Sequence, residues 1–235
     1  MSTTAIYLVR HAQIAENLPR PDGLLLYGAF PEAPLDEMGR RQAAALAARL
    51  ADVSLAVAYS SPYRRAEETA QAIVAGQAGS TPDPALRLDS RWQERDFGQL
   101  EALTVAQIAE VCPPGPEVLY ASEDGHPGGA ESLLEVRARA RQAFDELCER
   151  HQGQSVLVAS HKTTLRVLIC DLLKLPLTTY KRIGQENAAL NVVTIESDSS
   201  APEGRHVRVV LTNDVCHLGE VGDVPGRGAR GEPQG

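Results

Sequence analysis

The sequence predicts an α/β domain in three layers, with helices on both faces of a mostly parallel central sheet. Short apolar, β-branched runs alternate along the chain with longer segments of helical periodicity. Strand–helix–strand alternation is typical of a parallel sheet covered by helices. The length of 235 residues and the 43% of hydrophobic residues suit one large globular domain or two small ones.

The elements follow from local patterns taken in chain order. The predicted strands are the apolar runs 5–9, 54–59, 155–159, 188–196 and 206–212. The helix at 36–51 is rich in alanine, leucine and arginine, and Asp36 can cap its first turn. In 131–151 apolar residues recur on one face among alternating charges, which indicates a surface-packed helix. The other predicted helices are 64–76, 103–111 and 162–174.

Three segments show neither the periodicity of a strand nor that of a helix. Residues 18–35 and 112–129 combine prolines with turn residues, so we expect both to be loops over an active face. Residues 219–235 are rich in glycine, proline and charge. We therefore expect a single domain over 1–218 followed by a disordered tail.

Composition and charge exclude several classes of protein. The net charge of −8 argues against a general nucleic-acid binder, although a few local arginines can still attract a small anion into one cleft. No signal peptide and no apolar run long enough to span a membrane are recognised, so we expect a cytoplasmic protein. Widely spaced cysteines are expected to be reduced thiols and form no metal-ligand pattern with the histidines: Cys112, Cys148, Cys170 and Cys216.

Reactive side chains stand where three predicted strands end. The first strand leads directly to Arg10 and His11, and the second leads to Arg64 and Arg65. The third strand ends at Ser160-His161-Lys162. Ligands bind beyond the carboxyl ends of parallel strands, so these groups should meet on one face. Each alone could be structural, but the three together predict an anion site.

Two histidines and two arginines are suited to phosphoryl chemistry. Arginine binds phosphate through paired hydrogen bonds, and helix N-termini add backbone donors. A histidine nitrogen can attack phosphorus and form a covalent intermediate. The other cations can neutralise the transferring phosphoryl group, so neither a metal nor another cofactor is expected. These strand ends alone do not supply an acid for the leaving oxygen.

Six segments, in order, resemble sequence blocks of the histidine phosphatase, or phosphoglycerate mutase-like, superfamily. The first, LVRHAQIAEN at 8–17, is similar to that superfamily's Arg-His-Gly signature. The resemblance spans about residues 5–215 and implies the superfamily's fold and phosphoryl-transfer chemistry. The further blocks are APLDEMGRRQA at 33–43, SSPYRRAEETA at 60–70, RWQERDFGQLEAL at 91–103, PGGAESLLEVRAR at 127–139 and VLVASHKTTLR at 156–166.

The resemblance implies a role for each matching residue. His11 corresponds to the phosphoryl acceptor, and Glu94 to the general acid that protonates the leaving oxygen and then activates water. His161 corresponds to the second catalytic histidine, which also binds the phosphate. Arg65 rather than Arg64 falls on the arginine position, because it directly precedes Ala66. The implied phosphate ligands are Arg10, Asn17, Arg65 and His161.

The departures from the superfamily pattern concern substrate identity. Ala12 replaces a glycine, Ile14 replaces a common serine or threonine, Ala102 replaces a glycine, and Lys162 stands where glycine is common. Lys162 could be a solvated lysine at a helix start or could touch substrate.

Three functions follow from the resemblance. We expect a metal-independent phosphatase that acts on a small phosphorylated substrate through a phosphohistidine. The block DFGQLEALT differs from the mutase pattern, so cofactor-dependent phosphoglycerate mutase-type phosphoryl transfer is the alternative rather than the first expectation. A non-catalytic module that binds a phosphorylated ligand is a third. The physiological substrate and the oligomeric state stay open.

Overall fold

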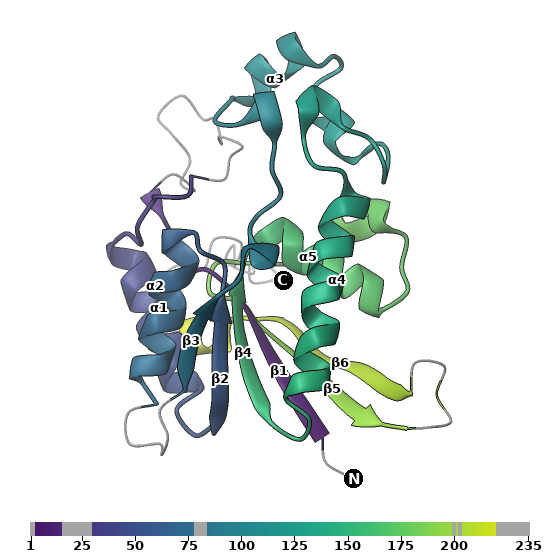
Figure 1. Ribbon diagram of the computed structural model, residues 1–235. Coiled ribbons are helices and arrows are strands. Elements are labelled where there is room, and N and C mark those ends of the chain that lie inside the picture. Colours follow the sequence, from purple (N-terminus) through teal and green to yellow (C-terminus); the bar gives the residue numbers. More distant parts are fainter. Residues whose placement is uncertain (1–2, 16–29, 78–83, 199–200, 202–203, 220–235) are drawn as a thin grey trace, which may run out of the picture.

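A computed structural model describes residues 3–15, 30–77, 84–198, 201 and 204–219. Its centre is a six-stranded sheet in the order β3-β2-β4-β1-β5-β6 (Figure 1). The strands are β1 (Thr3–Arg10), β2 (Leu55–Ser60), β3 (Ala85–Leu88), β4 (Ser155–Ser160), β5 (Leu190–Ser197) and β6 (Arg205–Asp214).

The four strands β1 to β4 run parallel, and this register brings their ends together. Arg10 pairs with Ser160, and Ser60 pairs with Ala159, so three carboxyl ends lie at one edge of the sheet. β5 is antiparallel to β1, and β6 is antiparallel to β5. The prediction of a mostly parallel sheet is confirmed.

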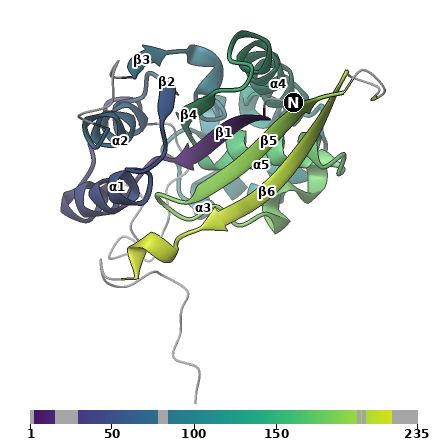
Figure 2. The same cartoon turned by 90° about the horizontal axis from the view of Figure 1, so that it is seen from below.

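Helices cover both faces of the sheet, as predicted (Figure 2). α1 (Glu37–Arg49) and α2 (Arg64–Ala75) lie on one face, while α4 (Leu133–Arg150) and α5 (Lys162–Leu172) lie on the other. Alternate residues of β1 enter two different cores, because successive side chains of a strand point to opposite faces. Val9 packs in the core that includes residues of α1 and α2, and Leu8 packs in the core that includes residues of α4 and α5.

Capping residues determine where two helices begin. The Asp36 side chain accepts a hydrogen bond from the Gly39 amide at 2.7 Å and so caps α1, as the sequence predicts. At α4, Ser132 and Glu135 form a reciprocal capping box. α4 therefore begins two residues after Glu131 rather than at residue 131.

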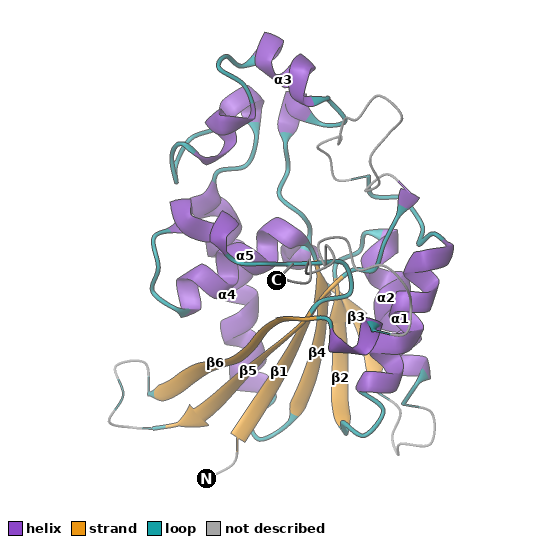
Figure 3. Cartoon of the chain, turned by 180° about the vertical axis from the view of Figure 1, so that it is seen from behind, coloured by secondary structure: helices purple, strands orange, loops and turns teal. Residues whose placement is uncertain are grey.

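Residues 96–131, here called the cap segment, form a lobe beyond the carboxyl ends of the parallel strands (Figure 1). It consists of helices and loops, including α3 (Val105–Val111) (Figure 3). The predicted loop at 112–129 contains 3-10 turns at Pro116–Tyr120 and Pro127–Gly129. Phe97, Leu100 and Ile108 belong to a small apolar core within this lobe.

Other expectations concern the termini and the thiols. All four cysteines are free. Within the described ranges, no helix combines the length and apolarity that crossing a bilayer requires. The predicted tail beyond Gly219 and most of the predicted loop at 18–35 lie outside the described residues, and so does Asn17.

Candidate active site

Three strand ends bring their reactive residues together. His11 directly follows β1, Ser61 follows β2, and His161 follows β4 as the N-cap residue of α5. The rings of His11 and His161 lie with their centroids 5.1 Å apart. Both residues are almost fully buried, with exposed fractions of 3% and 0%. These groups therefore lie together at one edge of the sheet, as the sequence predicts.

The backbone of His11 is held from two sides. Its amide donates to the carbonyl of Ser160 at 2.9 Å. Its carbonyl accepts the amide of Ala188 at 3.2 Å and the side-chain amide of Asn187 at 3.2 Å. The ring therefore projects from a backbone that β4 and the segment before β5 both restrain.

A hydrogen bond determines the tautomer of His11. Its Nδ1 lies 2.7 Å from the carbonyl oxygen of Ala12. A carbonyl can only accept a hydrogen bond, so Nδ1 carries the proton. In the neutral ring Nε2 therefore keeps its lone pair. Nε2 is thus the nitrogen that could accept a phosphoryl group.

The turn after His11 is packed closely against α1 and α2. The amide of Ala12 donates to Thr69 Oγ1 at 3.0 Å, and that hydroxyl donates to the carbonyl of Arg65 at 2.7 Å. On the α1 side, a Cβ added to Gly39 would lie 2.0 Å from the backbone oxygen of Gln13. Only glycine lets the first turn of α1 approach this backbone so closely.

Arg10 and Arg65 lie beside the two histidines. Arg10 donates through Nη1 to the carbonyl of Gln185 at 2.7 Å, and its buried Nε has no hydrogen-bond partner among the described residues. Arg65 donates through Nη1 to the carbonyl of Phe30 at 2.8 Å. Arg10 is 7% exposed and Arg65 is 2% exposed, so both positive charges are held in a poorly hydrated site.

The hydrogen bonds of His161 determine its tautomer as well. Arg65 Nη2 lies 3.1 Å from His161 Nδ1, and because a guanidinium can only donate, Nδ1 accepts. In the neutral ring Nε2 then carries the proton and donates to Ser61 Oγ at 2.8 Å. His161 therefore presents an N–H, whereas His11 presents a lone pair.

Both histidines are neutral at physiological pH. Burial, followed by the positive charge of Arg65, lowers the pKa of His11 well below its ordinary value of 6.5. The same two causes, in the same order, lower the pKa of His161. A neutral ring is the form that can act as a nucleophile.

Glu94 reaches the site from the loop that follows β3. Its Oε1 accepts the amide of Arg95 at 2.9 Å and the amide of Thr163 at 3.1 Å. Thr163 is the second residue of α5, so the carboxyl group is held at the start of the helix that His161 caps. Glu94 also contributes to the electrostatic environment of Arg10.

Arg139 on α4 holds the backbone of the loop that carries Glu94. Its Nη1 donates to the carbonyls of Arg91 and Gln93, each at 2.8 Å, and its Nη2 donates to the carbonyl of Glu94 at 3.3 Å. Two further hydrogen bonds, of 2.6 and 2.9 Å, join Arg139 to the Glu131 carboxylate. One guanidinium thus connects α4, the cap segment and the loop at 91–94.

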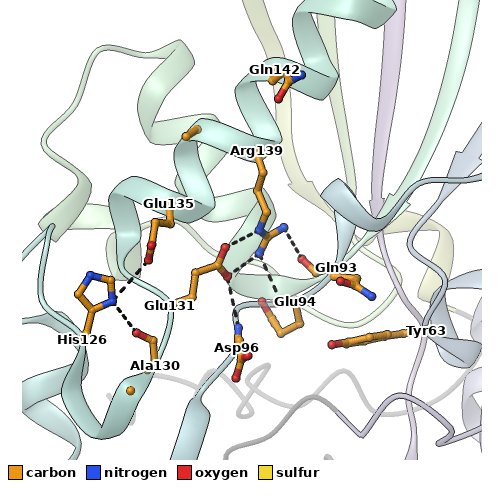
Figure 4. Close-up of a pocket in the computed structure, with 12 residues that line it drawn as sticks. Tyr63, Gln93, Glu94, Asp96, His126, Ala130, Glu131, Glu135, Arg139 and Gln142 are labelled. Carbon is orange, nitrogen blue, oxygen red and sulfur yellow. Dashed lines mark hydrogen bonds and ion pairs between the residues drawn. The ribbon is translucent and has the colours of Figure 1, made fainter.

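A cavity of about 750 Å³ lies between the cap segment and α4 (Figure 4). Glu94 and Tyr63 are part of its described lining, and neither catalytic histidine candidate is. The other lining carboxylates belong to Asp96, Glu131 and Glu135. This cavity therefore reaches the candidate acid, and carboxylates outnumber cationic side chains in its lining.

Most residues predicted from the sequence meet in this site. His11, His161, Arg10 and Arg65 form one buried cluster, and Glu94 adjoins it through α5. Asn17 is not among the described residues. Arg64, which the sequence pattern excludes, instead pairs at 2.8 Å with Glu68 at the surface.

Sequence reasoning did not single out four residues that arrange the site: Ser61, Thr69, Thr163 and Arg139. Each lies within one of the sequence blocks quoted above, and this membership is the only signal in the sequence that could have indicated them. Their partners could not be read from the pattern, since every bond that matters joins distant parts of the chain.

The arrangement can bind a tetrahedral dianion and transfer it. Arg10 and Arg65 supply positive charge, His161 supplies an N–H, His11 supplies a lone pair, and Glu94 supplies a carboxyl group. Among the described residues, no group of three or more histidine, cysteine, aspartate or glutamate side chains is arranged to hold a metal ion.

Comparisons with known proteins agree with this geometry. A sequence model of the histidine phosphatase superfamily (branch 1) matches residues 6–206. "Phosphoserine phosphatase 1" of Hydrogenobacter thermophilus is 32% identical over 92% of this chain and 94% of its own length. "2,3-bisphosphoglycerate-dependent phosphoglycerate mutase 2" of Gloeobacter violaceus is 31% identical over 71% of this chain and 74% of its own. Among solved structures, a mycobacterial glucosyl-3-phosphoglycerate phosphatase superposes with a TM-score of 0.76 and 26% identity, covering 90% of this chain and 99% of that one.

Proposed function

The chain belongs to the histidine phosphatase superfamily, and we propose that it is a metal-independent phosphatase that hydrolyses a phosphate monoester through a phosphohistidine. One observation carries the proposal above all others. The ring of His11 is neutral, its Nδ1–H is held by the Ala12 carbonyl, and Nε2 keeps a lone pair beside two buried arginines.

The first step is attack on phosphorus. The Nε2 lone pair of His11 forms a P–N bond while the ester P–O bond breaks, and the bonding electrons leave with the alcohol oxygen. The imidazole ring becomes positively charged in this step. The Ala12 carbonyl, which accepts the Nδ1–H, stabilises that charge.

Arg10, Arg65 and His161 hold the phosphoryl oxygens in this proposal. The guanidinium groups neutralise the charge of the transferring group. The His161 N–H, which donates to Ser61 Oγ in this structure, exchanges that partner for a phosphoryl oxygen when substrate binds. Asn17 is proposed as an additional donor from the resemblance alone. These cations supply the charge that a metal ion would otherwise bring.

Glu94 serves as acid and then as base. Its carboxyl proton passes to the departing alcohol oxygen. The resulting carboxylate then takes a proton from water, the hydroxide attacks phosphorus, and the P–N bond breaks with its electrons returning to Nε2. Inorganic phosphate leaves, and both His11 and Glu94 regain their starting states.

We propose a small phosphorylated metabolite as the substrate. The names of the similar proteins refer to phosphoserine, bisphosphoglycerate or phosphoglycerate, and glucosyl-3-phosphoglycerate. The free thiols support a reducing compartment, so the cytoplasm is the proposed location.

Rapid quenching tests the proposal directly. Wild-type protein mixed with ³²P-labelled substrate should yield an acid-labile, base-stable phosphoenzyme within one turnover, as well as free phosphate in the steady state. His11→Ala should form neither. Label on a serine, or turnover that persists in His11→Ala, would remove His11 as the acceptor.

Phosphoglycerate mutase activity is the second candidate, because one relative that is 31% identical carries that name. A bisphosphoglycerate-dependent mutase must pass the phosphoryl group of its phosphohistidine to the substrate, and take the substrate's other phosphoryl group back, before water reaches either. Incubation with 3-phosphoglycerate and a catalytic amount of 2,3-bisphosphoglycerate, which would phosphorylate the histidine of a mutase, distinguishes the two activities. Phosphate release with little 2-phosphoglycerate is expected; efficient interconversion without phosphate would establish the mutase. A non-catalytic binding module would produce neither and would leave a generic aryl phosphate intact.

A further inference from the structure

Two cationic side chains next to the site lack a counter-ion. Lys162 is the first residue of α5 and directly follows His161, and Arg166 lies one turn later. Residues four apart on a helix share a face. Across the described residues, neither side chain makes an ion pair within 4.0 Å, and the buried Nε of Arg166 has no hydrogen-bond partner.

The same region contains further positive charge. Desolvation, followed by the charges of Arg10 and Arg166, lowers the pKa of the exposed Lys162 to about 8. Desolvation likewise lowers the pKa of the half-buried Arg166. Arg10 is therefore electrostatically coupled to both cations. Glu94 and Glu186 raise the pKa of all three cations, but neither carboxylate lies within ion-pair distance of Lys162 or Arg166.

This charge exceeds what one phosphoryl group requires. Arg10 and Arg65 already match the two negative charges of a phosphate monoester. Arg166 is half-buried, Lys162 stands one turn before it on the same face of α5, and neither makes an ion pair with a described residue, so an anion that reached both cations would stabilise them. We propose that Lys162 and Arg166 form a second anion site, which binds the carboxylate of the phosphorylated hydroxy acid or amino acid that is cleaved at His11.

The acidic cavity beside Glu94 is a poor alternative for that carboxylate. Asp96, Glu131 and Glu135 line it, and Arg139 is already occupied by Glu131 (Figure 4). An anionic group would be repelled there. Arg166, by contrast, offers a planar guanidinium suited to a carboxylate, and Lys162 offers a mobile ammonium group.

The inference rests on the proposed phosphatase activity and names its substrate class. O-Phosphoserine and phosphoethanolamine test it, because they differ only in the carboxylate. Wild-type protein should have a kcat/KM at least tenfold higher for O-phosphoserine. Arg166→Gln and Lys162→Gln should each reduce that ratio fivefold or more, chiefly through KM for O-phosphoserine. Arg166→Lys, which keeps the charge, should restore part of the ratio.

Controls separate binding of the carboxylate from folding. Arg137→Gln removes an exposed arginine from α4 and should leave both substrates as in wild type. Melting temperatures identify any variant that fails to fold. A wild-type ratio near one, or equal losses on both substrates in the Arg166 and Lys162 variants, would overturn the second site. Phosphate release from p-nitrophenyl phosphate, which has no carboxylate, tests the phosphatase activity separately in wild-type protein.

Discussion

The Glu94 carboxylate accepts the backbone amide of Thr163, at 3.1 Å to Oε1 and 3.3 Å to Oε2. Thr163 is two residues after His161, so the candidate acid and the second histidine are held by the same helix start. This contact could not be predicted from the strand ends or from the sequence blocks, because residues 94 and 163 are far apart in the chain.

Glu94→Gln should therefore remove the acidic proton of residue 94 while keeping its hydrogen bond with the Thr163 amide. A glutamine oxygen can still accept the Thr163 amide, but the side chain cannot protonate a leaving oxygen. We expect kcat on an alkyl phosphate to fall by about 10²- to 10⁴-fold. An activated aryl phosphate should lose much less, since its leaving group needs little protonation. Equal losses on both substrates would show that another group is the acid.

Arg139→Gln should displace Glu94 through its backbone. The substitution removes hydrogen bonds to three carbonyls and to Glu131, which should lower the free energy of unfolding by about 3 kcal/mol. We also expect a larger loss on alkyl than on aryl phosphates, in the same direction as Glu94→Gln but smaller. In the double variant the two losses should not add, because both act on the same proton transfer.

Arg141 provides the control for this experiment. It lies on the same helix and pairs with Asp145 and Asp171 instead. Arg141→Gln should lower stability without changing the preference between leaving groups. If Arg139→Gln behaved in the same way, Arg139 would have a structural role only.

Stability should fall in mild acid because the two histidines are buried in their neutral form. Burial and Arg65 lower the pKa of His11 and His161 well below 6.5, whereas the unfolded residues titrate near 6.5. Below that pH the unfolded chain binds protons that the folded chain does not, so the free energy of unfolding decreases as pH falls. Each histidine adds a slope of up to about 1.4 kcal/mol per pH unit.

Denaturant unfolding between pH 7 and pH 5 measures this effect. His11→Asn and His161→Asn should each show a shallower decrease than wild type, and the double variant should show the shallowest. A slope identical in all four proteins would mean that these histidines do not titrate differently on folding.

Gly39→Ala should disturb the site from outside it. Alanine favours a helix by about 1 kcal/mol over glycine. Here, however, the added Cβ would lie 2.0 Å from the Gln13 carbonyl oxygen, and the backbone after His11 must move. We expect a net loss of about 1–2 kcal/mol in the free energy of unfolding together with a lower kcat. Glu37→Ala, at an exposed position of the same helix, should change neither by much. A more stable and fully active Gly39→Ala protein would contradict this.

Activity should persist after exhaustive chelation. The positive charge that stabilises phosphoryl transfer comes from Arg10 and Arg65 in the proposed mechanism, so no divalent ion takes part in a step. Turnover of p-nitrophenyl phosphate before and after dialysis against a chelator is the measurement. Loss of activity that Mg²⁺ or Zn²⁺ restores would refute the metal-independent mechanism.

The sequence alone determined the main elements and the reactive residues. Periodicity predicted five strands and five helices that the structure confirms within a few residues, because alternating and helical patterns reflect which faces are buried. It also placed Arg10, His11, Arg65 and His161 at strand ends, where a parallel sheet must bring them together. Glu94 came from resemblance alone, since nothing in its local pattern distinguishes it from an ordinary loop carboxylate.

Only the tertiary structure decided how those residues are held. The direction of β5 and β6 and the presence of the four-residue β3 depend on pairing with strands that are distant in the chain. The structure also decided the proton position on His11 and the three carbonyls that Arg139 binds. It further showed that, among the described residues, no carboxylate lies within ion-pair distance of Lys162 or Arg166. Local pattern reports burial and propensity, whereas hydrogen bonds and charge balance depend on which distant groups meet.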